Sequence, residues 1–546
     1  EIIELPHKTN GYRRKAQAIL WTDANGNGSI QGDEAATAFY ATTQAWGHEG
    51  GNDWSIETVA GPPGSALDVD VSGTHITVTL ATDAEGAVTS TAADVIAALN
   101  AEPALDDVLD AYPYRGNAAN GIAPIGSAQF SDGLSAPPHI PREPFTVKMI
   151  RIGKHRDGSR VGVFGYAQEH AREWQTPLMA LETAERLLRN YDNDPETRRL
   201  VDGLDIFIIP TVNPDGTNYS MYDNPVQRKN MTNHCPDSLS DPLARDAWGV
   251  DLNRNHSVGS LFDGYAGASS SCTSEVYAGP AEHSEPEARN LDWVVETFDN
   301  IKFSMNIHSH GGYFMWSPGA YISNGRIPLE RPSLGVEDYF FEASERILGA
   351  IKEHRGTVVH PGRTGPTSDV LYSAAGNSAD ELYYNHGVIA WNFELGVQIW
   401  NGSTWTTPQA EPGNLSGFQP RFPEAKDQAM EFSNGLIEMM AVALDYSRDK
   451  VGPTTDLVVT GGDGDLVEFT FTSSEPATIY YTTDGSKPTF SSPVLQAEYI
   501  RDEAETLTVP AGTEVKWFGV DIAGNTERRY DPDGRAPTHQ REVVRP

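Results

Sequence analysis

Two residues that can bind a metal ion stand three positions apart, His170 and Glu173. At a sharp turn of the chain, an imidazole nitrogen and a carboxylate oxygen at this spacing can converge on one ion. Zinc accepts this mixture of ligands and, in catalytic sites, leaves one position for water. The pair alone is a weak signal, because a chain with 15 histidines contains about one such spacing by chance. A turn histidine capped by a glutamate at a helix start is the alternative, so residues further along the chain must decide.

The elements expected around this pair would hold both side chains in place. Val161 and Val163 open a segment whose apolar residues suit a buried strand. The sequence then changes period, and residues 173–190 show an amphipathic helical pattern. The apolar stripe of this pattern consists of Leu178, Leu181, Ala184 and Leu188. The pair is therefore expected at a rigid strand-to-helix turn.

Length, composition and charge limit the classes of function. A chain of 546 residues is too long for one core and predicts roughly two to four domains. Its hydrophobic content of 38% is ample for folded domains, and the sequence has no apolar run long enough to predict a membrane span. Net charge is −36, from 76 acidic and 40 basic residues, which argues against a nucleic-acid partner because phosphate backbones attract the opposite sign. The acidity fits adaptation to salt, a preference for non-acidic substrates, or the solubility charge of a secreted protein.

The cysteines and the first residue bear on location. Cys235 and Cys272 can form one disulfide, which fits an oxidising compartment, or remain two buried thiols. The chain begins at Glu1 without Met or a signal-like segment, from which we expect a processed, secreted form.

A second candidate ion site lies near the start of the chain. Residues 23–34, DANGNGSIQGDE, match the offsets of a twelve-residue calcium loop, with Gly28 at the turn and a backbone carbonyl at Ile30. The oxygen ligands expected in this loop are Asp23, Asn25, Asn27, Ser29 and Glu34. The segment resembles an EF-hand-like loop, and residues 35–46 are expected to form its exit helix, although no entering helix is evident. A turn rich in Asp, Asn and Gly without an ion is the alternative.

The rest of the first 144 residues shows no recognisable chemistry. Residues 12–21 are strand-like, and residues 66–83 alternate apolar and polar side chains between turn signals. A helix is expected at 91–102, capped by Ser90 or Thr91. Residues 115–144 are rich in Gly, Ala, Ser and Pro and predict a loop or linker.

From residue 145 onward the pattern is that of an α/β domain. Residues 146–170 give two strands around Asp157-Gly158, and residues 204–212 form a buried strand that runs into a turn at 213–216. Strand, helix and strand in this order predict a mixed, mostly buried sheet flanked by helices. A long amphipathic helix from Glu424 is expected to close the domain.

Polar motifs follow one another along this domain. They are Gln227-Arg228-Lys229, GVDLNRN at 249–255, YAGPAEHSEPE from Tyr277, FSMNIHSHGG from Phe303 with His308, LYSAAGNSAD from Leu371, and WNFELG from Trp391 with Glu394. Together with the first pair, they make residues 145–450 resemble a zinc carboxypeptidase of the pancreatic carboxypeptidase A type. The spacing from Tyr372 to Glu394 agrees with that family without a gap.

The resemblance implies a complete catalytic site. His170, Glu173 and His308 would bind zinc, and Glu394 would be the general base that takes a proton from water and gives it to the leaving amine. The other implied roles are Arg228 at the developing oxyanion, Asn253, Arg254 and Tyr372 on the substrate's terminal carboxylate, Arg172 on the residues upstream of the scissile bond, and Asp251 on the tautomer of His170. Taken singly, each of these residues could be part of an ion pair or a packing residue without a catalytic role. Their occurrence together, in the order found in the family, favours catalysis.

The implied specificity pocket is neutral. Ala379 aligns with the pocket floor, where basic-specific relatives carry a carboxylate and apolar-preferring relatives carry a large aliphatic side chain. Asp380 lies next to it but occurs in relatives of both preferences. The other aligned pocket positions are Gly319, Thr367, Ala374 and Asn392. A roomy, neutral pocket predicts acceptance of apolar or varied side chains.

The resemblance also bears on the cysteines. Cys235 and Cys272 bracket residues 249–255, as a disulfide does in the digestive members, which implies that they pair. The opening helix and the inhibitory pro-segment of those members are not recognisable in this chain.

After Gly452-Pro453 the pattern becomes all strand, with turn signals at Asp484-Gly485 and Gly524-Asn525. YYTTDGSKPT and VDIAGN resemble the small immunoglobulin-like β-sandwich at the C-terminus of chitobiases and other secreted bacterial hydrolases. Attachment to a surface or polysaccharide and a merely stabilising role are the alternatives.

The sequence therefore predicts three parts, at 1–144, 145–451 and 452–546. We expect a secreted zinc metallocarboxypeptidase with a structural calcium ion, acting on peptides or proteins with a free C-terminus. A zinc-dependent hydrolase of cell-wall peptides or amides is a second hypothesis. A catalytically inactive binding protein is a third, against which the presence of Glu394 and all three ligands argues.

Overall fold

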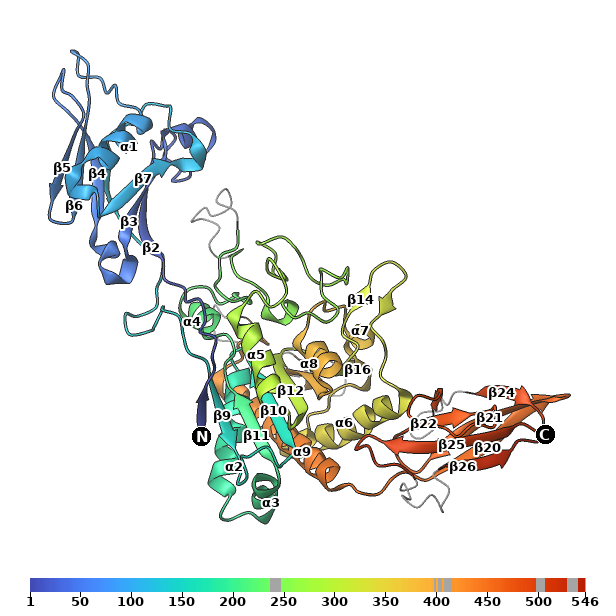
Figure 1. Ribbon diagram of the computed structural model, residues 1–546. Helices are drawn as coiled ribbons and strands as arrows, with labels where there is room; N and C mark the ends of the chain where they lie inside the picture. The colour runs from blue at the N-terminus through green and yellow to red at the C-terminus, as the bar shows by residue number, and fades with distance from the viewer. Residues whose placement is uncertain are drawn as a thin grey trace.

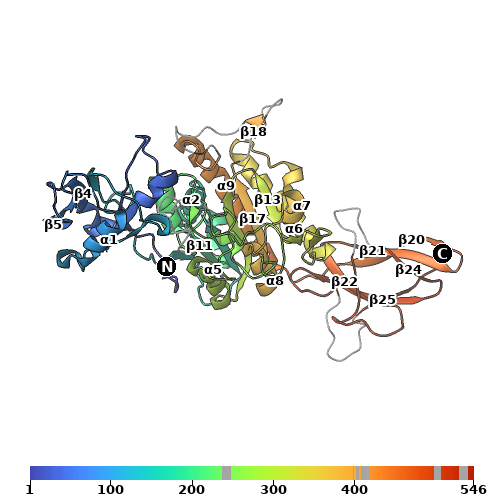
Figure 2. The same cartoon turned by 90° about the horizontal axis from the view of Figure 1, so that it is seen from above.

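The computed structural model describes residues 1–235, 247–396, 399–400, 405–406, 415, 417–496, 506–527 and 539–545. Three parts follow one another along the molecule: an N-terminal module, a central sheet covered by helices, and a C-terminal pair of sheets (Figures 1 and 2). Among the described residues, no helix is both long and apolar enough to cross a membrane.

The central part is built on an eight-stranded mixed sheet, as the sequence predicts. In spatial order its strands are β1 (Ile2–Glu4), β9 (Lys148–Ile152), β11 (Asp205–Ile209), β10 (Gly162–Ala167), β12 (Ile301–Ser309), β17 (Ile389–Leu395), β13 (Tyr313–Trp316) and β16 (Thr364–Pro366). Strands β11, β10, β12 and β17 run parallel, while β9 and β13 are antiparallel to their neighbours β11 and β17. The two strands predicted around Asp157-Gly158 form, but β11 lies between them, so they do not make a hairpin.

Helices cover both faces of this sheet (Figure 1). One face carries α2 (Thr176–Asn190), α3 (Pro195–Gly203), α6 (Leu334–Arg355) and α9 (Phe422–Arg448). The other face carries α5 (Pro286–Thr297) and α8 (Ser378–His386). Because side chains alternate along a strand, Ile206 and Ile208 enter the first core while Phe207 and Ile209 enter the second. The predicted closing helix is α9.

The remaining elements of the central part are short. They are α4 (Pro214–Tyr222), α7 (Thr367–Val370), the 3-10 turns η8 (Leu252–Arg254) and η9 (Pro361–Arg363), and the strand pairs β14 (Tyr321–Ile322) with β15 (Ile327–Pro328) and β18 (Ile399–Trp400) with β19 (Trp405–Thr406). The turn predicted at 213–216 is instead the start of α4. There Asn213 caps the helix by accepting a hydrogen bond from Gly216 N at 2.9 Å.

The buried stripe of α2 differs from the predicted one. Leu181 and Leu188 are 47% and 62% exposed, and the buried positions are Thr176, Met179, Ala180, Thr183, Ala184 and Leu187. The hydroxyls of Thr176 and Thr183 donate to backbone carbonyls within the same helix region, at 2.9 Å each. Because these threonines satisfy their own polar groups, they can face the core and displace the stripe.

The N-terminal module contains two small sheets and one helix. The sheets are β2 (Lys15–Leu20), β3 (Phe39–Trp46) and β7 (Leu109–Pro113), and β5 (Asp68–Ser72), β6 (His75–Leu80), β4 (Ser55–Ala60) and β8 (Ile125–Gln129). Helix α1 (Ala92–Ala101) begins as predicted, with Thr91 as its cap. The exit helix expected at 35–46 is wrong: after a 3-10 turn, η1 (Gly32–Thr37), the chain forms β3 between β2 and β7. Its aromatic and β-branched residues suit a half-buried strand.

The module is connected to the central sheet by two segments that lie side by side. Strand β1 pairs antiparallel with β9 at the sheet edge. Beyond it, Leu5 N donates to Val147 O, Thr9 N to Phe145 O and Tyr12 N to Arg142 O, each at 2.9 Å. The first residues of the chain are thus part of the central sheet, and the module lies between β1 and β9 in sequence.

The C-terminal part is a pair of facing sheets, as predicted. One contains β20 (Thr455–Asp463), β21 (Leu466–Ser473) and β24 (Leu507–Pro510), and the other β23 (Val494–Gln496), β22 (Ala477–Thr482), β25 (Glu514–Asp521) and β26 (Gln540–Val543). Phe469, Phe471, Ile479 and Trp517 are among the side chains that fill the space between them. This is the layered packing of a β-sandwich.

Candidate metal centre

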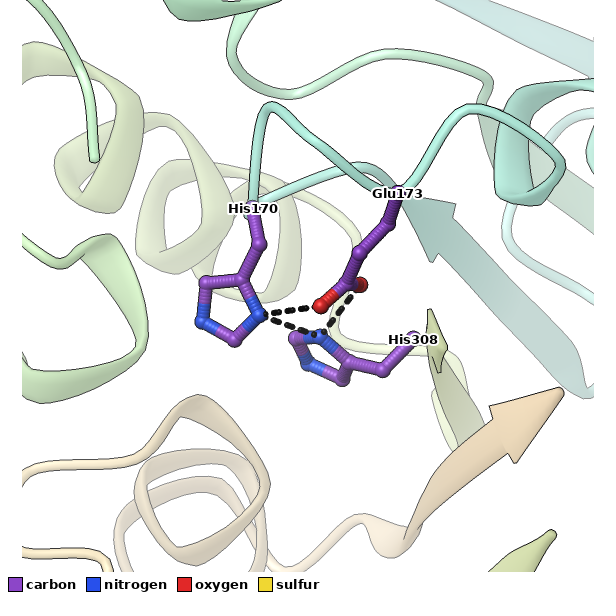
Figure 3. Close-up of side chains that lie close together, drawn as sticks. All are labelled: His170, Glu173 and His308. Atoms are coloured by element: carbon purple, nitrogen blue, oxygen red, sulfur yellow. Dashed lines mark hydrogen bonds and ion pairs between the residues drawn. The ribbon is translucent and has the colours of Figure 1, made fainter. Parts of the chain in front are cut away.

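His170, Glu173 and His308 converge on one point of the central part (Figure 3). Nδ1 of His170 lies 2.8 Å from Oε1 of Glu173, Nδ1 of His308 lies 3.2 Å from Oε2 of Glu173, and the two Nδ1 atoms lie 3.1 Å apart. All three side chains are buried. The local pair and the distant histidine, 138 residues apart, therefore form one cluster.

Local structure fixes the two nearer members of this cluster. Strand β10 ends at Ala167, and Gln168 takes a left-handed backbone conformation with φ of 60°. Glu173 N then donates to His170 O at 3.2 Å, which closes a turn just before α2 starts at Thr176. The H-x-x-E pair thus lies in the predicted strand-to-helix turn, and His308 comes from β12, the parallel neighbour of β10.

Each histidine of the cluster turns its second nitrogen toward a carboxylate. Nε2 of His170 lies 3.2 Å from Asp251, and Nε2 of His308 lies 3.3 Å from Glu169. Both carboxylates are fully buried. Burial opposes the charge of Asp251, but Arg228 and Arg254 hold its pKa well below the ordinary value. Such carboxylates place the proton of each imidazole on Nε2 and leave Nδ1 as the ligand atom.

The donor set fits zinc. With the protons of both rings on Nε2, the two Nδ1 atoms, which lie 3.1 Å apart beside a carboxylate, repel one another unless a positive charge joins them. Two imidazoles and one carboxylate are the ligands of a common type of catalytic zinc site. The buried partners of the two Nε2 atoms are the outer groups that such a site requires.

Glu394 lies next to this cluster. Strands β12 and β17 pair so that His308 and Glu394 are direct partners in register, which places both side chains on the same face. Burial and the negative charge of Glu173 raise the pKa of Glu394 to about 7. Among the described residues Glu394 forms no hydrogen bond or ion pair, so its carboxylate is available to a proton.

Three arginines gather in a cavity of about 470 Å³. Its walls include Arg172, Arg228, Arg254, Tyr372 and Glu275. Arg228 Nε donates to Asp251 at 2.9 Å, and Arg254 donates through Nε and Nη1 to the carbonyls of Gly267 and Asn253. Within the described part of the chain, the other guanidinium nitrogens of Arg228 and Arg254 have no acceptor. The cavity is therefore suited to an anionic group.

The remaining predicted substrate residues are placed differently from one another. Tyr372 is 47% exposed, and its ring lies 6.0 Å from the guanidinium of Arg254. Asn253 is buried instead: its Nδ2 lies 3.2 Å from Nε2 of His308, and its Oδ1 accepts from Ser378 N at 2.9 Å. In this structure Asn253 therefore packs against a predicted metal ligand rather than on the cavity wall.

Ala379, the predicted pocket floor, has no exposed surface. It packs in the apolar core between the central sheet and α8, so in this structure it lines no open pocket. Its neighbour Asp380 is also buried, accepting from Gly319 N at 2.9 Å and from Asn377 at 2.7 Å. The carboxylate of Asp380, in the first turn of α8, is thus already engaged in hydrogen bonds within the protein.

The disulfide and the loop at 23–34 are also described. Cys235 and Cys272 are joined in a disulfide, as the resemblance implies. In the loop, Asp23 accepts from Gly26 N and Gly28 N at 2.7 and 2.9 Å, and Glu34 accepts from Ala24 N and Gln31 N at 3.0 and 3.1 Å. The loop thus folds around its own acidic side chains.

Sequence reasoning missed Glu169. Besides His308, this carboxylate accepts from Asn306 at 2.6 Å and from Ser378 at 3.4 Å. An acidic residue two positions after a fully buried strand was the available signal, because a charge at such a position is costly unless it is paired.

Comparisons with known proteins follow the same division of the chain. Residues 143–410 match the zinc carboxypeptidase family, and residues 463–531 match the chitobiase/beta-hexosaminidase C-terminal domain. Carboxypeptidase A2 from Rattus norvegicus is 30% identical over 241 residues, covering 44% of this chain and 50% of that protein. Carboxypeptidase B from Rattus norvegicus is 29% identical over 249 residues, covering 45% and 54%. The chain therefore contains a zinc carboxypeptidase domain and a chitobiase-type domain, and it spans about half the length of these relatives.

Solved structures with a similar fold include carboxypeptidase A from Helicoverpa armigera, at 23% identity and a TM-score of 0.45 over 56% of this chain and 66% of that one. Murein-tripeptide amidase MpaA from Escherichia coli O157 matches at 14% identity and a TM-score of 0.29 over 54% and 87%.

Proposed function

We propose that this protein is a zinc metallocarboxypeptidase that hydrolyses the C-terminal peptide bond of peptides and proteins. The position of Glu394 carries the proposal. Glu394 is the strand partner of His308, one of the three proposed metal ligands, and it forms no hydrogen bond or ion pair with any of the three among the described residues. It is therefore placed to act on water, in a domain that matches the zinc carboxypeptidase family.

The ligand cluster defines the metal's contribution. Zinc, when held by His170, Glu173 and His308, supplies a Lewis acid that polarises a carbonyl and makes water more acidic. Asp251 and Glu169 orient the two imidazoles for this purpose through their Nε2 atoms.

The chain's own residues carry the proton and the charge. Glu394 takes a proton from the attacking water and later gives it to the leaving amine. Arg228 is held by Asp251 through Nε, which leaves its terminal nitrogens toward the cavity, where they stabilise the negative charge that develops on the scissile carbonyl oxygen. Because these donors are fixed before the reaction, they need no reorganisation during it.

The arginine cavity selects a free C-terminus. Arg254 and Tyr372 bind the terminal carboxylate, and Arg172 binds the residues upstream of the scissile bond. Asn253 can join them only by turning its amide away from His308. The preference for apolar or varied terminal side chains rests on the aligned pocket positions alone, because Ala379 is buried in this structure.

Cell-wall peptides are a second candidate substrate, because a stem peptide also ends in a free carboxylate that this cavity can bind. Zinc-dependent hydrolysis of side-chain amides needs no such cavity and is less well supported. An inactive binding protein is less well supported, because binding alone does not require the free carboxylate of Glu394.

The test is hydrolysis of a peptide series that differs only in its last residue, each peptide prepared with a free and with an amidated C-terminus. We expect release of the last residue from the free peptides, loss of activity with a chelator and recovery with zinc. Equal activity on amidated peptides would exclude the exopeptidase, and cleavage of cell-wall fragments alone would favour the second substrate class.

Four further features belong to this proposal. The disulfide supports secretion, because such bonds persist in oxidising compartments. The loop at 23–34 supports a structural calcium ion through the spacing of its oxygen ligands. The chitobiase-type domain supports attachment to a polysaccharide or surface. We place the parts of the protein at 1–144, 145–451 and 452–546, except that strand β1 belongs to the central sheet.

A further inference from the structure

A second group of histidine and carboxylate side chains lies on the α5 and α8 side of the central sheet. His256 follows η8, His283 precedes α5 and Asp292 lies on α5. One possible ligand atom from each of the three lies within 4.8 Å of those of the other two. None of these residues belongs to the site described above.

We propose that His256, His283 and Asp292 bind a second divalent transition-metal ion, of which zinc is the best fit. Two imidazoles and one carboxylate repeat the donor set of the first cluster. Imidazole nitrogens favour zinc and its neighbours in the first transition row over calcium or magnesium, which prefer oxygen.

The unpaired nitrogens of His256 support a ligand at this point. This side chain is 1% exposed, and neither ring nitrogen has a hydrogen-bond partner among the described residues. Asp292 Oδ1 lies 3.7 Å from Nδ1 and Glu169 Oε1 lies 3.9 Å from Nε2, both beyond hydrogen-bond distance. A buried polar group is costly without a partner, and a metal ion facing Nδ1 would supply one.

The contact between His283 and Asp292 is a second observation in favour of a bound ion. Nδ1 of His283 lies 2.6 Å from Asp292 Oδ2, but the two atoms are not aligned as a hydrogen bond. His283 also takes a left-handed backbone conformation with φ of 51°, which brings its ring toward α5 at some cost in strain. A cation bound by both side chains would replace this unaligned contact, with the two atoms moving apart to the spacing of ligands on one ion.

The outer contacts of the second group have the same orientation as those of the first but are longer. In both groups the histidines face their partners through Nδ1 and face a carboxylate through Nε2: Asp251 and Glu169 in the first, Glu169 and Glu381 in the second. In the second group these Nε2 distances are 3.9 Å. Glu169 is common to both, with Oε2 toward His308 and Oε1 toward His256. One buried carboxylate thus lies between the two groups, 3.3 Å from His308 and 3.9 Å from His256.

A cavity reaches two of the three proposed ligands, His283 and Asp292. This cavity of about 400 Å³ between α5 and α8 is lined by His283, Asp292, Glu381, His386 and His7, among others. Glu381 is not one of the proposed ligands, because its Oε2 already accepts hydrogen bonds from Ser257 N, Ser257 Oγ and Val258 N.

The rival explanation is an imidazolium held between two carboxylates. Without a metal, burial opposes the charge of His256, yet the carboxylates of Asp292 and Glu169 raise its pKa to about 10. The two explanations predict different numbers of bound metal ions, because a protonated imidazole has no free nitrogen with which to bind a metal.

The experiment counts bound zinc. Full-length protein is stripped with a chelator, reloaded with zinc, passed through a desalting column and analysed by mass spectrometry for zinc per chain. We expect two equivalents in the wild type, one in His283→Gln, one in Asp292→Asn, one in His170→Gln and none in the double variant His170→Gln/Asp292→Asn. His7→Ala, which changes the same cavity but no proposed ligand, should retain two. As a control for folding, the melting temperature of each chelated variant should match that of the chelated wild type.

Two results would overturn the proposal. In one, the wild type holds a single equivalent that is lost in His170→Gln but kept in Asp292→Asn. In the other, His283→Gln and Asp292→Asn both keep two equivalents. A single equivalent that is lost in Asp292→Asn and kept in His170→Gln would support the second site while refuting the first, so the failures of the two metal proposals are distinguishable. Anomalous scattering at the zinc edge locates the ion independently of any activity.

Discussion

Replacing Glu394 with glutamine should lower activity and raise stability at the same time. The two side chains have nearly the same shape, so the change removes a charge and a proton acceptor without opening a cavity. Since Glu394 lies beside the ligand cluster but is not part of it, zinc should remain bound.

The loss of activity follows from the proposed role. A positioned general base contributes about 100- to 10,000-fold to rate, so kcat/KM should fall by that factor. The fall should appear mainly in kcat, because the arginine cavity that binds the substrate is unchanged.

The gain in stability follows from the cost of holding this charge. Burial and the nearby Glu173 raise the pKa of Glu394 from 4.5 to about 7 in the metal-free protein. For an acid whose pKa rises on folding, this cost is absent below the unfolded pKa and complete above the folded one. Since one pKa unit corresponds to about 1.4 kcal/mol, ionised Glu394 destabilises the metal-free fold by at most roughly 3 to 4 kcal/mol above pH 7.

Three measurements test these effects: kcat/KM on a peptide with a free C-terminus, zinc per chain, and urea unfolding of chelated protein at pH 5 and pH 8. The variant should exceed the wild type in stability by a much larger margin at pH 8 than at pH 5, where most of the cost has vanished. Glu353→Gln, an exposed change on α6, is the matched control and should alter none of the three. Retention of activity within tenfold would refute the general-base role, loss of zinc would make Glu394 a ligand, and equal stabilities at pH 8 would refute the account of its charge.

Three other changes test separate parts of the structure. Glu169→Gln should weaken zinc binding at His308 by about 10- to 100-fold, because the orienting carboxylate becomes a neutral amide; competition with a chelating dye measures this, and unchanged affinity would contradict the contact. Arg254→Lys should lower kcat/KM about tenfold or more on free peptides and leave any residual activity on amidated ones unaltered, because a point charge replaces a two-pronged donor; equal losses on both would exclude carboxylate binding. Glu287→Gln should raise the melting temperature at pH 8 but not at pH 4.5, because burial and the charges of Glu285 and Asp215 raise the pKa of Glu287 to about 8; a rise of similar size at both pH values would show that charge is not the cause.

The sequence is a good guide where chemistry and local geometry coincide. The His170–Glu173 pair lies where the change from strand to helix predicts it, and the long apolar stripe after Glu424 becomes α9. His308 and Glu394 have no such local signal. Only their likeness to a known family connects them with the pair, and the register of β12 and β17 is what places them side by side.

Other features depend on contacts that no local pattern contains. Residues 35–46 look helical beside a calcium-like loop, but pairing with β2 and β7 makes them a strand. The buried side of α2 is displaced because threonines satisfy their hydroxyls on the backbone. His256, His283 and Asp292 show no motif spacing, and only the packing of α5 against the central sheet brings them together.

The pairing of β1 with β9 makes the whole N-terminal module equivalent to one oversized hairpin loop. From Leu5 and Val147 out to Tyr12 and Arg142, the two arms stay hydrogen-bonded to each other, so a short reverse turn could join them there. Such a deletion would leave the edge of the central sheet intact. The central domain should therefore still fold without the N-terminal module.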